Sequence, residues 1–114
     1  MTTVIFHSAG GRLDGFAVKG HSGYAEAGAD IVCAAISAAV GLTECTVNEV
    51  MGIGAAVKTD EKRARVSLRL PPALNGESES LCQAVLTGLM VYLRSLGEEY
   101  PGNLTVLLDD DDED

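Results

Sequence analysis

The chain has 114 residues and a net charge of −9, and 46% of its residues are apolar while 22% are charged. This length and balance predict one domain with one modest core and exclude a disordered or fibrous chain. Bulk acidity argues against an acidic partner, so we expect no direct contact with nucleic acid. We expect no membrane association either, because no apolar run reaches the roughly 18 residues that span a bilayer.

Cysteine usage and the N-terminal sequence indicate a reduced, cytoplasmic protein. The three cysteines, at positions 33, 45 and 82, fit neither a disulfide framework nor a zinc site. The first residues, MTTVIFHSAGG, lack the basic region and long apolar stretch of a secretory signal. We therefore predict a cytoplasmic protein with no metal and no cofactor.

The last six residues, DDDDED, account for −6 of the net charge and leave −3 on the rest of the chain. Such blocks of like charge are usually solvated and disordered, and some are interaction tails for basic partners. We predict a single domain over residues 1–108 and a disordered acidic tail over residues 109–114.

The first predicted elements are a β-hairpin and a helix. TTVIFHS (2–8) and LDGFAVKG (13–20) are short apolar runs joined by the turn sequence AGGR. A helix then begins after Asp30, which we expect to be its N-cap, and ends near Gly52. Its apolar positions recur at helical spacing, at Val32, Ile36, Ala39, Thr43, Val47 and Val50.

A second hairpin, a second helix and a last strand follow. GAAVKT (54–59) and KRARVSLRL (62–70) flank a polar Asp-Glu turn. The second arm alternates strictly, with Ala64, Val66, Leu68 and Leu70 on one face and Arg63, Arg65, Ser67 and Arg69 on the other. After two prolines, NGESES (75–80) starts a helix that buries Leu81, Val85, Leu89, Leu93 and Leu96 and stops near Gly97. NLTVLL (103–108) is the last strand. The order ββαββαβ predicts a two-layer α+β fold, with two helices packed on a mostly antiparallel sheet.

A histidine and a cysteine flank the start of the first helix, in GHSGYAEAGADIVCAAISAAV (20–40). If Asp30 is the N-cap, Cys33 is the third helical residue, where unpaired N–H groups and the helix dipole favour a thiolate. The same N–H groups could stabilise an oxyanion. A glycine-rich loop containing Gly20, Gly23 and Gly28 could bring His21 to the thiol as its base.

Other residues of this segment have supporting or structural interpretations. Asp30 or Glu26 could orient the imidazole, and Ser37 lies one turn after Cys33 on the same stripe. Cys33 could equally be a small core residue, since cysteine is among the most buried residue types. We interpret Cys45 and Cys82 as packing residues and His7 as a hydrogen-bonded histidine of the first strand.

The same segment resembles the signature of the ribosomal-processing cysteine proteases, the Prp family. The motif is a Gly-His-x-Gly-Tyr loop followed by Gly-x-Asp-Ile-Val-Cys-Ala-Ala, and GLMVYLRSLGEEYP (88–101) also fits, so the resemblance covers most of the chain. It implies His21 and Cys33 as the catalytic dyad, with Asp30 and Ser37 in support. Ser22 stands where alanine is common in the family. The resemblance implies a homodimeric endopeptidase that removes an N-terminal extension from a large-subunit ribosomal protein.

Two other functions compete with this interpretation. A non-catalytic ribosome-associated module could bind RNA phosphates through Arg63, Arg65 and Arg69, although a solvated strand face is the better interpretation of these residues. A redox protein using Cys33 lacks a Cys-x-x-Cys pair and a nearby resolving cysteine.

Overall fold

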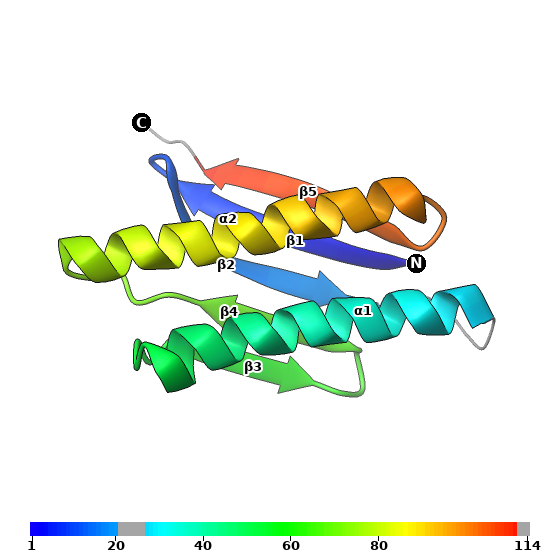
Figure 1. The fold of residues 1–114 in the computed structure, drawn as a ribbon, viewed down its shortest axis with the longest axis horizontal. Helices are drawn as coiled ribbons and strands as arrows, with labels where there is room; N and C mark the ends of the chain where they lie inside the picture. The colour runs from blue at the N-terminus through cyan, green and yellow to red at the C-terminus, as the bar shows by residue number, and fades with distance from the viewer. Residues whose placement is uncertain (21–26, 112–114) are drawn as a thin grey trace.

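The computed structural model describes residues 1–20 and 27–111, and of residues 27–30 it describes the backbone. The predicted ββαββαβ order is confirmed, and Figure 1 shows its two layers. The elements are β1 (Thr2–Ala9), β2 (Arg12–Lys19), α1 (Ala27–Glu44), β3 (Ala56–Asp60), β4 (Arg65–Arg69), α2 (Gly76–Glu99) and β5 (Leu104–Asp111).

The strands form one sheet with the order β3-β4-β2-β1-β5. Three of the four pairings are antiparallel, and the pairing of β1 with β5 is parallel. The expected mostly antiparallel sheet is therefore confirmed. A parallel pair needs a long crossover connection, and here α2 and the other elements between β1 and β5 supply it.

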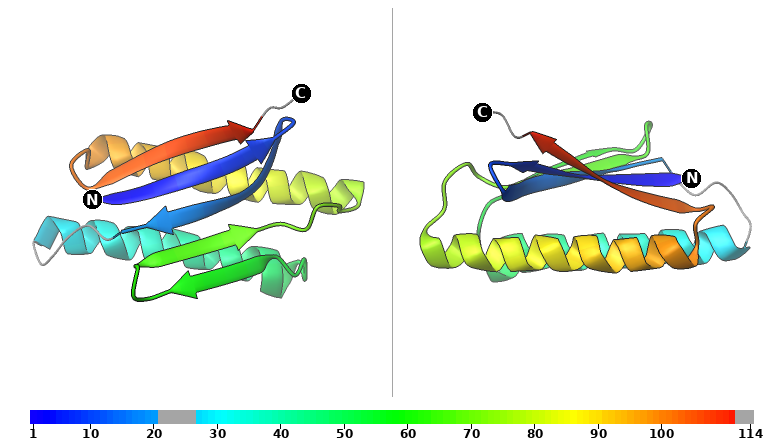
Figure 2. Two further views of the ribbon diagram at one scale, coloured as in Figure 1. Left: turned by 180° about the vertical axis from the view of Figure 1, so that it is seen from behind. Right: turned by 90° about the horizontal axis from the view of Figure 1, so that it is seen from above.

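Both helices cover the same face of the sheet, as the view from above in Figure 2 shows. Alternate residues of β1 point at them, so Val4 and Phe6 are buried while their neighbours are half-buried. Phe6 meets Phe16 of β2 with ring centroids 5.6 Å apart, and Leu68 of β4 extends the same layer. The core therefore lies between the helices and one side of the sheet.

Helix α1 begins earlier than we predicted, at Ala27, so Asp30 is its fourth residue and not its N-cap. Alanine has the highest helix propensity, and the alanines before Asp30 favour helix in a stretch that we interpreted as loop. The helix continues as a π-helix over Cys45–Val50. The predicted apolar face is confirmed at Val32, Ile36, Thr43 and Val47, but Val50 is 74% exposed because it lies beyond the sheet-facing stripe.

The segment Ile31–Val50 is long and apolar enough to cross a bilayer, so our statement that no such run exists is wrong. The run was missed because isolated polar residues such as Ser37 and Glu44 interrupt it without making it polar overall. Length and composition alone are weak evidence for a membrane span, because a core helix passes the same test.

The buried stripe of α2 is as predicted from Leu89 to Leu96 and is shifted by one residue in the first half of the helix. Cys82 and Leu86 are buried with Leu89, Leu93 and Leu96, whereas Leu81 is 50% exposed. The packing role predicted for Cys82 is confirmed, and burial raises the pKa of its thiol. The same prediction is wrong for Cys45, which is exposed.

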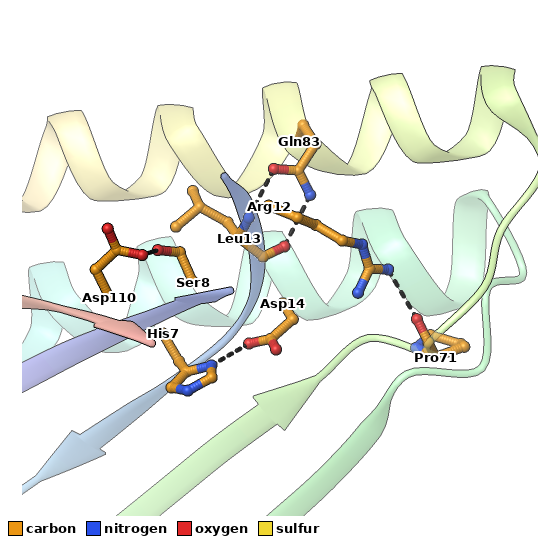
Figure 3. A network of polar contacts seen from close by, with 8 residues as sticks. All are labelled: His7, Ser8, Arg12, Leu13, Asp14, Pro71, Gln83 and Asp110. Carbon is orange, nitrogen blue, oxygen red and sulfur yellow. Dashed lines mark hydrogen bonds and ion pairs between the residues drawn. The ribbon is translucent and has the colours of Figure 1, made fainter. Parts of the chain in front are cut away.

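Polar contacts between the first half of α2 and the start of β2 determine which side of the helix faces the sheet. Gln83 accepts a hydrogen bond from the Leu13 N–H at 2.9 Å and donates to the Leu13 carbonyl at 2.7 Å (Figure 3). Arg12 donates to Glu79 at 2.6 Å and to the Pro71 carbonyl at 2.8 Å. The hydrogen bond to Glu79 raises the pKa of Arg12. These contacts turn the Glu79–Gln83 side of the helix inward and leave Leu81 outside.

The neighbouring strand ends carry two further side-chain hydrogen bonds. His7 Nδ1 lies 2.6 Å from Asp14 Oδ1, which confirms the hydrogen-bonded strand histidine that we expected. The Ser8 hydroxyl donates to Asp110 at 2.7 Å. Both contacts join residues on adjacent strands of the sheet.

The acidic C-terminal segment is partly ordered. Strand β5 runs to Asp111, and its residues 109–111 pair with His7, Ser8 and Ala9 of β1. The predicted disorder is therefore wrong for residues 109–111, because the ladder with β1 and the Ser8–Asp110 contact hold them in the sheet. Residues 112–114 lie outside the described part of the chain.

Gly15 permits a close approach of β2 to β4. A Cβ atom placed there would lie 2.3 Å from the Leu68 carbonyl oxygen, and that backbone cannot move without disturbing the sheet. We expect Gly15→Ala to lower the free energy of unfolding by about 1–3 kcal/mol in urea denaturation. Gly41→Ala is the matched control, since Gly41 is an exposed residue of α1 with nothing within 4 Å, and it should raise the free energy of unfolding by about 0.5–1 kcal/mol. Equal stability of the two variants would contradict this account.

Candidate active site

Cys33 opens into a pocket of about 280 Å³ between α1 and the end of β2. Ile36 and Ser37, one turn further along α1, line the same pocket, which is where the helical stripe predicted Ser37. Val18 and Gly20 contribute from the end of β2. Cys33 is half-buried, and Val18, Ile36 and Val66 are among the apolar residues that line its pocket.

The turn between β3 and β4 forms the opposite wall, and the sequence analysis missed it. Asp60, Glu61, Ala64 and Arg65 of this turn line the pocket with Cys33. Asp60 also accepts a hydrogen bond from the Arg63 N–H at 3.2 Å, which holds the turn in shape. Two carboxylates and one guanidinium therefore face the thiol's pocket.

A backbone hydrogen bond ties this turn to the end of β2. The Gly20 N–H donates to the Ala64 carbonyl at 2.9 Å. Both residues have left-handed backbone conformations, with φ +78° at Gly20 and +50° at Ala64, the latter unusual for a residue with a Cβ atom. The contact fixes Gly20 at the pocket, immediately before His21 in the sequence.

The early start of α1 corrects the chemistry that we assigned to Cys33. Cys33 is the seventh residue of the helix, where a backbone N–H has an intrahelical acceptor. The prediction that its own N–H group is an available oxyanion donor is therefore wrong. The helix dipole also acts mainly on the first turn, so it favours a thiolate here less than we expected.

The other predicted residues fall in different parts of the chain. Gly20 lines the pocket, as the loop interpretation required. His21, Gly23 and Glu26 lie outside the described residues, and Gly28 and Asp30 are placed by backbone alone in the first turn of α1. Within residues 1–20 and 27–111, no cluster of His, Cys, Asp and Glu is arranged to hold a metal ion.

Cys33 is a partly exposed thiol that lines a pocket, and reactive cysteines occupy partly exposed sites whereas buried structural cysteines are inert. The family model described as cysteine protease Prp matches residues 1–105, and the chain belongs to this family. It is a cysteine endopeptidase by that membership. A curated relative, the ribosomal processing cysteine protease Prp of Bacillus subtilis (strain 168), is 29% identical over 91 residues, which are 80% of this chain and 81% of the relative.

Solved structures share the fold. SMU.848 from Streptococcus mutans superposes with a TM-score of 0.86 at 23% identity, over 96% of this chain and 95% of that one. The processing protease Prp from S. aureus with a substrate peptide gives 0.82 at 22% identity. The same S. aureus protease with a covalently linked product peptide gives 0.75 at 26% identity, and both matches cover 96% of this chain and all of the other.

Gly20 offers a test of the pocket's architecture. A Cβ atom at this position would lie 2.9 Å from the Met1 carbonyl oxygen, and φ of +78° is strained for alanine. We expect Gly20→Ala to reduce the free energy of unfolding by about 1–3 kcal/mol in urea titrations. Gly102→Ala, at a position with open space around it, should change it by less than about 0.5 kcal/mol. A Gly20→Ala protein as stable as wild type would show that the observed conformation is not required.

Proposed function

We propose that this protease removes the N-terminal extension of a large-subunit ribosomal protein with a dyad of Cys33 and His21. The observation that carries this proposal is that Cys33 lines the pocket between α1 and the β3–β4 turn. The name of the Bacillus subtilis relative, a ribosomal processing protease, supports the substrate class, and the S. aureus structures support a peptide that becomes covalently attached.

The chain's connectivity supports His21 as the base. His21 is bonded to Gly20, and both Gly20 and Cys33 line the pocket. The segment between them therefore begins and ends at the same site. A histidine within hydrogen-bond reach of the thiol is the usual activating partner of a catalytic cysteine.

The proposed reaction has two steps. His21 takes the proton from the Cys33 thiol, and the sulfur attacks the scissile carbonyl to form a tetrahedral intermediate. His21 then protonates the leaving amine as the C–N bond breaks, which leaves a thioester on Cys33 and releases the mature ribosomal protein. Water, deprotonated by His21, attacks the thioester, and the carboxylic acid of the extension leaves as the thiol is restored.

Ser37 and Asp30 have supporting roles in this proposal. Ser37 lines the pocket one turn after Cys33, and we assign its hydroxyl a contact with the bound peptide. Asp30 lies in the first turn of α1, between His21 and Cys33 in the sequence, and we assign it the orientation of the imidazole. We also assign Gly20 and Gly23 the backbone freedom to admit an extended peptide, whereas Gly28, which we predicted as a loop residue, lies in the first turn of α1.

Cleavage of the extended ribosomal protein tests the dyad directly. The substrate is incubated with wild type, Cys33→Ala or His21→Ala, and intact-mass analysis detects release of one defined N-terminal peptide. We expect the rate to fall at least about 10³-fold in either variant, because each removes a group that takes part in bond making or proton transfer. Cys45→Ala removes an exposed thiol outside the pocket and should cleave at the wild-type rate. Cleavage by Cys33→Ala would show that the nucleophile is another residue.

We further propose that the protein is a cytoplasmic homodimer that pairs through the outer surface of its helices. A groove of about 510 Å³ lies between α1 and α2, and small or apolar residues line most of it, namely Ala35, Ala38, Ala39, Leu42, Thr43, Thr46, Val85, Gly88, Leu89 and Tyr92. Leu42 is 68% exposed and Tyr92 49%. Small and apolar residues of this kind let two helix layers approach closely, and homodimer interfaces are more apolar than the remaining surface.

Sedimentation velocity tests the dimer. Leu42→Glu places a charge in the groove and should shift the protein from dimer to monomer, since an unpaired buried charge opposes association. Val50→Glu is the matched control, because Val50 is exposed but lies outside the groove, and it should remain dimeric. A wild-type monomer, or a Leu42→Glu dimer, would refute this surface.

A further inference from the structure

Most of the chain's cations gather on the face of the sheet opposite the helices. This open face contains a hollow of about 1310 Å³. Six of the eight Lys and Arg residues line it, namely Lys19, Lys58, Lys62, Arg63, Arg65 and Arg69. The net charge of the chain is −9, so this face has the opposite charge to the protein as a whole.

The strand register explains why these side chains share one face. Lys19 of β2 pairs with Arg65 of β4, and Lys58 of β3 pairs with Ser67. Arg65, Ser67 and Arg69 are alternate residues of β4, so all three project from the sheet on the same side. Leu68 projects toward the helices, which places the cations on the open side.

Five of these six cations have no ion-pair partner in the part of the chain that the structure describes. Only Arg63 forms a pair, with Asp60 at 3.7 Å. By contrast, Arg12, on the helix-facing side, is paired with Glu79 at 2.6 Å. Asp60, Glu61 and Asp109 are the acidic residues that line the hollow, so its positive charges outnumber its negative charges by six to three.

We propose that this open face binds single-stranded RNA through its phosphates. Extended peptides usually add to the edge of a sheet, where backbone groups are unpaired, whereas the face of a sheet is a known platform for single-stranded RNA. The centre of the face holds small residues, Gly15, Ala17 and Ser67, so a nucleic-acid backbone can lie close to the sheet.

The side chains predict binding that is independent of sequence. Two rings are among the described residues that line the hollow: Phe16 is buried in the core, and the half-buried ring of His7 is hydrogen-bonded to Asp14, so we expect base stacking to contribute little. Affinity must then come from phosphate contacts and depend steeply on salt. We name RNA rather than DNA because the proposed substrate is a ribosomal protein, which associates with RNA. This choice rests on the proposed function.

Fluorescence anisotropy with a labelled, mixed-sequence RNA of about 20 nucleotides tests the proposal. If the five unpaired cations contact phosphates, the slope of log K against log salt is about −3.5. We expect Lys58→Gln/Arg69→Gln to bring this slope to about −2 and weaken binding at least tenfold at low salt. Both side chains are exposed, so the double variant should fold, which circular dichroism verifies.

Matched variants test whether RNA binding depends on the cations of the open face or on the net charge of the protein. Arg94→Gln removes an exposed cation from α2, outside the hollow, and should bind RNA as wild type does. Lys58→Arg/Arg69→Lys keeps both charges and should retain the wild-type slope. Cleavage by Lys58→Gln/Arg69→Gln of the isolated ribosomal protein, without RNA, should be unchanged. This readout distinguishes failure of the RNA site from failure of the proposed protease function.

Two results would overturn the proposal. The first is an equal affinity of wild type and Lys58→Gln/Arg69→Gln for the RNA. The second is binding of a synthetic DDDDED peptide, but not of RNA, which would assign the face to an acidic protein segment.

Discussion

Burial of only one face of a five-stranded sheet is the constraint on which the rest of this structure depends. Phe6, Phe16 and Leu68 supply apolar surface on one side, and both helices pack there because each has one apolar stripe to bury. Polar and charged residues occupy most of the other side, because successive side chains of a strand point to opposite faces of the sheet. The core, the uncovered cationic face and the pocket at the sheet's end all follow from this division.

Local patterns predicted the order of the elements because each pattern is a short-range consequence of burial. The alternation from Arg63 to Leu70 predicted β4 and its two faces, and the short apolar run TTVIFHS predicted β1. The buried side of the first half of α2 could not be predicted in this way. Leu81 and Cys82 fit a helical stripe equally well, and the contact of Gln83 with Leu13, 70 residues away, decides between them. The ordering of Asp109 to Asp111 likewise depends on a distant partner, strand β1.

Local sequence patterns likewise predicted some residues of the candidate site but not those contributed by a distant segment. Cys33 and Ser37 were placed on one stripe by helical spacing, and the pocket contains both. The wall across from the thiol comes from a turn about 30 residues later, which in the sequence is merely a polar Asp-Glu connection. The start of α1 was misplaced because Asp30 satisfies the rules for an N-cap while Ala27 and Ala29 favour helix. Small free-energy differences decide where a helix begins, and a start four residues earlier than predicted moves Cys33 away from the first turn and its unpaired N–H groups.

The β3–β4 turn joins the pocket to the open face of the sheet. Asp60, Glu61 and Arg65 line both spaces, and the Gly20–Ala64 hydrogen bond anchors the turn to the strand end beside Cys33. A phosphate on the open face and a peptide carboxylate in the pocket would compete for the same Arg65 guanidinium, because Arg65 lines both spaces. Each ligand would then weaken the binding of the other by the same free energy, since linkage between two sites is reciprocal.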